Sequence, residues 1–164
     1  MVLGAMFLER TYTDKWKTKK EYQQGMALIQ SYVTNYLVKN YEGIEKIEWQ
    51  GVGVEWQKSP IYGHPLFENY IESDVRVFVS KGKYFTVRFT LSDETHYNNN
   101  LKKYEKSDSM TDDNTDFLIQ SDFEDATCNL NQKEKEKFNQ FKKSPNGSSS
   151  AKVIYNLDIH KLKY

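Results

Sequence analysis

A long helical pattern, followed at once by strand patterns, constrains the fold of this chain more than any other feature. Apolar residues recur at intervals of three and four over residues 18–40, which places them on one face of a helix: Tyr22, Met26, Ile29, Val33 and Leu37. Thr18 and Glu21 have the spacing of a capping box, and Gly43 suits the left-handed position beyond a helix end. A helix with one apolar stripe needs a flat apolar surface to cover it, so the pattern predicts a helix packed on a sheet.

Alternating patterns predict the strands of that sheet. Between residues 44 and 57 the apolar phase changes across Gly51, which is typical of a β-bulge. Residues 71–91 alternate on both sides of a Lys81-Gly82-Lys83 turn and predict a hairpin. A further alternation over residues 153–159 predicts a C-terminal strand.

The part of the chain between the hairpin and the C-terminal strand is mostly polar. Residues 108–116 are expected to form a flexible surface segment, and residues 117–119 a short strand. A second helix is expected over residues 131–143, with Asn131 and Glu134 as its capping residues. Its few apolar side chains place it at the periphery. Residues 144–150 have the Pro, Gly and Ser content of a linker.

These patterns together predict an α+β fold. The chain has 164 residues, enough for one domain with a single core, which we place over residues 18–164. In it, the long N-terminal helix packs on a curved antiparallel sheet of four or five strands, and the second helix lies at the edge.

Residues 1–17 are treated separately because they begin with an apolar run. Val2 to Leu8 is too short to span a bilayer and ends abruptly at Glu9 and Arg10. Two interpretations stay open: the trailing end of a truncated membrane anchor, or a short leading strand or added tag. The first makes residues 10–17 a polar tether and attaches an extracytoplasmic module to the cell membrane. Without an anchor the protein would be cytoplasmic.

Composition restricts the classes of function. Lys plus Arg and Asp plus Glu both number 23, and this balance argues against nucleic acid as a partner, because nucleic-acid binders carry a basic excess or a basic face. The single cysteine, Cys128, excludes an intramolecular disulfide. Tyrosine is abundant, with 12 residues, and suits half-buried sheet faces and binding surfaces alike.

No motif for a metal, a cofactor or catalysis emerges. The three histidines stand in different segments and lack the spacing of a zinc site. Asp112, Asn114 and Asp116 match the first three ligands of a calcium loop. However, Phe117 stands where the loop requires Gly, and Phe123 where it requires a bidentate Glu. The sequence therefore predicts a solvated acidic segment rather than a calcium site, with no cofactor and no enzymatic activity.

Charge is segregated along the chain. Residues 105–125 are strongly acidic, whereas residues 10–20 and 133–143 are each net basic. Such patches can steer a protein partner, or they can attract one another within the fold. The first alternative selects seven candidate contact residues: Asp108, Asp112, Asp113 and Asp116 on the acidic segment, and Tyr84, Thr86 and Arg88 on the polar side of the hairpin. The simpler interpretation of the hairpin residues is a solvated sheet face.

One resemblance covers the first half of the chain. The segment Tyr36-Leu37-Val38-Lys39-Asn40-Tyr41-Glu42-Gly43-Ile44-Glu45-Lys46-Ile47, then Ser59-Pro60-Ile61-Tyr62-Gly63, then the hairpin over residues 75–91, resembles uncharacterised exported, lipoprotein-like proteins of low-GC Gram-positive bacteria with a cystatin-like fold. The resemblance implies an extracytoplasmic, non-enzymatic module. The chain departs from it in having no lipid-attachment cysteine near its start.

Three functions are compatible with these features. The first is a membrane-associated, protein-binding module, in its sharper form an immunity protein that neutralises an exported antibacterial toxin. The second is a cystatin- or NTF2-like domain with a pocket between helix and sheet for a small ligand or an enzymatic reaction. The third is an accessory component of a conjugation or secretion apparatus. Polar groups converging between helix and sheet would favour the second, and packed Val, Ile and Phe would argue against it.

Overall fold

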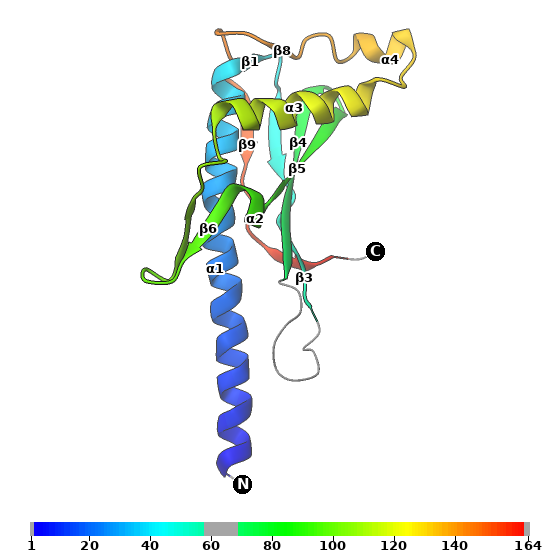
Figure 1. The fold of residues 1–164 in the computed structure, drawn as a ribbon. Coiled ribbons are helices and arrows are strands. Elements are labelled where there is room, and N and C mark those ends of the chain that lie inside the picture. The colour runs from blue at the N-terminus through cyan, green and yellow to red at the C-terminus, as the bar shows by residue number, and fades with distance from the viewer. Residues whose placement is uncertain (1, 58–68, 163–164) are drawn as a thin grey trace.

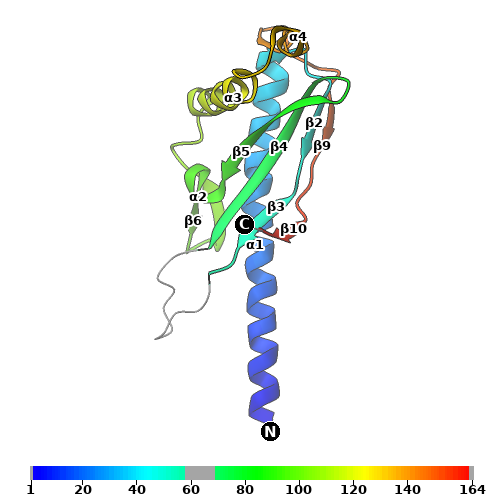
Figure 2. The ribbon, with the colours of Figure 1, turned by 90° about the vertical axis from the view of Figure 1, so that its right-hand side faces the viewer.

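One long helix runs along the whole molecule. The computed structural model describes residues 2–57 and 69–162, and in it α1 (Val2–Asn40) crosses one face of a sheet and continues well past the sheet's end towards the N-terminus (Figures 1 and 2). The predicted apolar stripe is confirmed, since all five of its residues are buried. The predicted start was wrong: Thr18 and Glu21 lie inside the helix and form no capping box. None of the helices within the described ranges is long and apolar enough to cross a membrane.

The central sheet has six strands, so the α+β prediction of a long helix on a sheet is confirmed. The strands are β2 (Lys46–Trp49), β3 (Val52–Glu55), β4 (Tyr70–Ser80), β5 (Lys83–Thr90), β9 (Lys152–Ile154) and β10 (Ile159–Lys161). The β4–β5 pair is the predicted hairpin, and β4 also pairs antiparallel with β2 and β3. The sheet is mixed rather than wholly antiparallel, because β9 and β10 join β2 and β3 in parallel.

The bulge predicted at Gly51 is confirmed by the register. Trp49 stands opposite Val75 and Gly53 opposite Glu72, so four steps along one strand match three along the other. Gly51 has a φ of +94°, and a Cβ there would lie 2.8 Å from the Asp158 carbonyl oxygen. That same carbonyl accepts a hydrogen bond of 2.8 Å from the Val52 N–H.

The C-terminal strand predicted over residues 153–159 is two short strands instead. β9 pairs with β2, and β10 pairs with β3. Residues 155–158, which connect β9 to β10, pass beside the bulge at Gly51. Gln30, buried in α1, donates to the Asn156 carbonyl at 2.7 Å and to Ser73 Oγ at 3.1 Å. The first bond holds the irregular segment to the helix, and the second joins the helix to β4.

Most of the remaining elements pack beside α1 or against the β4–β5 hairpin. They are β1 (Tyr41–Glu42), α2 (Leu91–Glu94), β6 (Thr95–Asn98), β7 (Lys103–Lys106), α3 (Asp112–Thr127), α4 (Gln132–Glu136) and β8 (Lys142–Lys143). β6 and β7 form a hairpin against α1, where the Gln24 side chain bonds both backbone groups of Tyr104. β1 pairs with β8 beside the end of α1.

The helix α3 overturns the prediction of a flexible segment and a short strand over residues 108–119. Thr111 caps it, since its hydroxyl accepts from the Asn114 N–H at 3.2 Å. Thr115 and Ile119 are buried and Phe123 is partly buried, a helical spacing of four. This stripe is narrow, and the many aspartates around it hid it in the sequence.

The second predicted helix is shorter than expected. Asn131 caps α4 by accepting from the Glu134 N–H at 2.9 Å, as predicted, but the helix ends at Glu136. Phe138 and Phe141 continue from it into the core, where both are buried. Residues 144–148, expected to be a linker, lie against the end of α1: the Ser144 and Ser148 N–H groups each donate at 2.8 Å to carbonyls of its last turn.

Apolar side chains fill the space between α1 and the sheet. At most 1% of each of these residues is exposed: Met26, Ile29, Val33, Ile47, Trp49, Val75, Val77, Val79 and Val87. The Trp49 indole N–H donates to Thr34 Oγ1 at 2.9 Å, so the largest side chain here has a polar partner as well. The Pro-Gly loop that contributes to the resemblance, with His64, falls outside the described residues.

Candidate functional site

Tyrosine–carboxylate bonds hold α3 against the C-terminal half of α1. The Tyr32 hydroxyl donates to Asp112 at 2.5 Å, and the Tyr36 hydroxyl donates to Asp116 at 2.8 Å. Asp112 and Asp116 are one helical turn apart on α3, as are Tyr32 and Tyr36 on α1. Burial, and then the bond to Asp112, raise the pKa of Tyr32 to about 12. Two of the four predicted acidic contact residues therefore have partners inside the molecule.

Asp116 is the centre of this attachment. It also accepts from the Tyr41 hydroxyl at 2.5 Å and from the Gln120 amide at 2.8 Å, and it pairs with Lys143 at 3.2 Å. Burial alone would raise its pKa, but bonds from Tyr41, Tyr36 and Lys143 outweigh burial and hold the pKa of Asp116 below its usual value. Its side chain is only 15% exposed. The Asp116–Lys143 ion pair thus joins the acidic segment to the basic segment within the fold.

The calcium-loop match is not realised in the fold. Asp112, Asn114 and Asp116 lie on the first turns of a helix, and the two carboxylates face tyrosine hydroxyls. Within residues 2–57 and 69–162, no three potential metal ligands come together. The acidic segment is therefore a helix with its own internal partners, rather than the solvated loop that the sequence predicted.

The other side of α3 is exposed and acidic. Asp113, Glu124 and Asp125 are exposed, and the described part of the chain offers none of them an ion pair. Phe117 stands among them with 70% of its surface exposed. Asp108 is exposed in the turn before the helix. Here the acidic charges face solvent around one aromatic ring.

The polar side of the hairpin points away from α1. On β5, Tyr84, Thr86 and Arg88 are exposed, whereas the residues between them are buried. The Tyr84 ring packs on Phe78 with centroids 4.9 Å apart. The structure therefore places the three predicted hairpin residues in one row on the outer face of the sheet.

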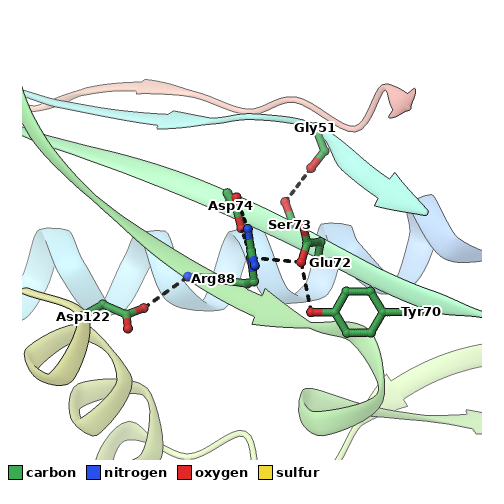
Figure 3. Close-up of polar contacts among 7 residues, drawn as sticks. All are labelled: Gly51, Tyr70, Glu72, Ser73, Asp74, Arg88 and Asp122. Carbon is green, nitrogen blue, oxygen red and sulfur yellow. Dashed lines mark hydrogen bonds and ion pairs between the residues drawn. The ribbon is translucent and has the colours of Figure 1, made fainter. Parts of the chain in front are cut away.

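Arg88 is bound by carboxylates from the neighbouring strand (Figure 3). Its Nε lies 2.9 Å from Asp74 and 2.9 Å from Glu72, and its Nη2 lies 3.2 Å from Asp74. The Asp74 bond, against the opposing effect of burial, raises the pKa of Arg88. Glu72 also accepts from the Tyr70 hydroxyl at 2.9 Å. Because two carboxylates balance one guanidinium, Arg88 does not offer an uncompensated positive charge.

Arg88 also connects the hairpin to α3. Its backbone N–H donates to Asp122 at 3.3 Å, which brings the C-terminal half of α3 beside β5 (Figure 3). Burial raises the pKa of Asp122, with a further contribution from Asp125 that the Arg88 bond opposes. The Asp122 carboxyl group nevertheless accepts the hydrogen bond from the backbone N–H of Arg88.

An open hollow of about 670 Å³ lies between the outer sheet face and α3. The side chains around it are Asp74, Tyr84, Phe85, Thr86, Arg88, Asp122, Asp125 and Ala126. It joins all three predicted hairpin residues to Asp122 and Asp125, which the sequence analysis did not select. The sequence did not predict the Asp74–Arg88 pair, because the register shifts between Phe78 and Ser80 and a count back from the Lys81-Gly82-Lys83 turn misses it. The approach of α3 had no local signal either.

The acidic residues of α3 thus divide into two groups. Asp112, Asp116 and Asp122 accept hydrogen bonds from within the fold, whereas Asp113, Glu124 and Asp125 face solvent. Comparison with known proteins adds no relative, since no family model, no curated protein and no solved structure matches the chain.

Proposed function

We propose that this protein is a non-enzymatic, extracytoplasmic and membrane-associated module that binds a protein partner through the exposed side of α3. One observation carries the proposal: α3 has six acidic residues and no Lys or Arg among its 16 residues, and Phe117 stands 70% exposed among them. An exposed aromatic ring within a polar rim is the usual anatomy of a protein contact surface. The partner surface is expected to be basic around an apolar pocket that receives Phe117.

The attachment of α3 supports this proposal energetically. The Asp112 and Asp116 bonds to α1 and β1 fix the helix before any partner arrives, so little conformational freedom is lost on binding. The exposed carboxylates would accelerate encounter with a basic partner and weaken with added salt. The hollow beside β5 extends the surface, with Tyr84 as a second aromatic contact at 40% exposure.

The sharper form of the proposal is an immunity protein that neutralises an exported antibacterial toxin. A rigid acidic surface on a small protein is suited to covering a basic surface on another molecule. An accessory role in a conjugation or secretion apparatus would use the same surface, and the partner's identity separates these two roles. A pocket between helix and sheet has less support, because the side chains described there are mainly packed Val, Ile and Trp.

The experiment compares three forms of the full chain as baits for proteins from the producing strain and its neighbours. The first is the wild type. The second carries D113K, F117A and E124K, which change exposed residues of α3 and leave Asp112 and Asp116 intact. The third is a matched control, E45K, D93K and L101A, with the same change of charge and one exposed apolar residue truncated elsewhere.

The proposal expects one protein that the wild type and the control retain in stoichiometric amount and that the α3 variant loses. Purified, that protein should bind the wild type in solution, with an affinity that falls as salt rises. If it is a toxin, added wild-type protein should abolish its growth inhibition, and the α3 variant should not. Equal retention by all three baits would overturn the assignment of the surface to α3.

A further inference from the structure

The end of the molecule away from α3 carries a basic hollow. It lies where α1 passes the end of β3 and strand β10, and its volume is about 500 Å³. The residues around it are Lys15, Lys19, Trp56, Gln57, Ile159, His160 and Lys161. None of these residues is acidic. Lys17 and Lys20 stand on the same turns of α1, so residues 15–20 contain four lysines and no carboxylate.

Tryptophan accompanies these lysines. The Lys15 ammonium lies 4.9 Å from the centre of the Trp56 ring, and the Lys20 ammonium lies 5.7 Å from that of Trp16. Trp16 is 56% exposed, although its apolar ring would normally be covered. No ion pair joins these lysines to another residue in the part of the chain that is described.

The order of residues along α1 matches the layers of a membrane surface. The helix continues past the hollow to Val2, clear of the rest of the fold (Figures 1 and 2), and its first residues are the apolar run over residues 2–8. With a rise of 1.5 Å per residue, Leu8 lies about 12 Å along the axis from Trp16. Apolar residues prefer the acyl region, whereas Trp and Lys prefer the interface and the headgroups.

We infer that this end of the protein docks on an anionic lipid surface, with residues 2–8 towards the acyl chains and Lys15, Lys19 and Lys161 on the headgroups. The positive charge selects anionic lipid, and the adjacent apolar run favours a membrane over a soluble anion. The inference rests on the membrane association in the proposed function and names the surface responsible. α3 stays at the far end of α1, free to meet a protein partner.

The test is co-sedimentation of the full chain with vesicles of phosphatidylcholine alone or of phosphatidylcholine with one quarter phosphatidylglycerol. The wild type should bind the anionic vesicles and be released by salt. Replacing three lysines, K15Q/K19Q/K161Q, should lower partitioning about 100-fold, at roughly fivefold per lysine. A control with the same loss of charge at the opposite end, K81Q/K133Q/K135Q, should bind like the wild type.

Tryptophan fluorescence supplies a second readout. Trp49 is buried, so a blue shift on vesicle addition should come from Trp16 and Trp56 and disappear in W16F/W56F. Absence of binding to anionic vesicles at low salt would overturn the inference, as would equal loss in both lysine variants. Release by inorganic phosphate, but not by chloride of equal ionic strength, would assign the hollow to soluble anions instead. None of these outcomes involves α3, so the partner experiment stands or fails separately.

Discussion

The two ends of the molecule use charge differently. At the α3 end, carboxylates are bonded to tyrosines and to Lys143, and part of the acidic charge holds the fold together. At the other end of α1, the lysines around Trp56 have no ion pair within the described ranges. A net charge of zero conceals this difference. A charge without an internal partner can be replaced with little change in the free energy of unfolding. A charge that is bonded within the fold cannot.

The largest effect should follow from removing the central carboxylate of the acidic end. Asp116→Ala leaves the Tyr36 and Tyr41 hydroxyls without their shared acceptor in a partly buried site. We expect the free energy of unfolding to fall by about 3 kcal/mol, since these are charge-assisted bonds whose donors become unpaired. Urea denaturation measures it. Asp113→Ala, on the exposed side of the same helix, is the control and should change stability by less than about 0.5 kcal/mol. Similar losses in both would contradict the division of α3 into two groups.

Phe117→Ala should weaken partner binding while leaving the stability of the fold unchanged. The ring is 70% exposed, so its removal should leave the free energy of unfolding within about 0.5 kcal/mol of wild type. As the proposed anchor of the α3 contact, it should cost about 2 kcal/mol of binding free energy, roughly 30-fold in Kd. Isothermal titration with the partner identified by the bait experiment measures this loss. An unchanged Kd would remove Phe117 from the contact surface, and Leu101→Ala, also exposed, serves as control.

How far the sequence could predict this molecule depends on how local each signal is. The α1 stripe, the β4–β5 hairpin and the bulge at Gly51 follow from patterns within a few residues, and all are confirmed. The parallel pairing of β9 and β10 joins residues about a hundred positions apart, and no local pattern specifies it. The arrangement of these strands was therefore predicted incorrectly, whereas the start of α1 was wrong because the spacing of a capping box also occurs inside the helix.

The candidate site shows the same limit. Alternation placed Tyr84, Thr86 and Arg88 on one side of β5, which is where they lie. The division of the α3 acids into bonded and exposed groups depends on tyrosines 80 residues earlier in the chain. Without those partners in view, Asp112 and Asp116 were indistinguishable from Asp113.

Acid should weaken the α3 end selectively. The pKa of Asp116 is held below its usual value, so the folded state binds this proton less readily than the unfolded state. Its stabilisation is therefore present above the unfolded pKa of about 3.9 and is lost as pH falls through the lower folded value. Unfolding measured between pH 6 and pH 3 should show a steeper loss of stability for wild type than for Asp116→Asn. Parallel curves would show that the carboxylate contributes as a neutral acceptor only.

The smallest effect should come from exposed lysines, and here the two ends can be compared directly. Lys143 is paired with Asp116 at 3.2 Å but is 56% exposed, so Lys143→Gln should lower the free energy of unfolding by about 0.5 kcal/mol. Lys19→Gln, in the basic hollow, should lower it by less than about 0.3 kcal/mol, because no ion pair with a described residue is lost. Vesicle binding should rank the two variants in reverse, with Lys19→Gln the weaker binder by roughly fivefold. Thermal unfolding and co-sedimentation on the same preparations measure both quantities. If one variant were worse in both assays, charge at the two ends would not be divided between fold and surface, and the contrast drawn from the structure would fail.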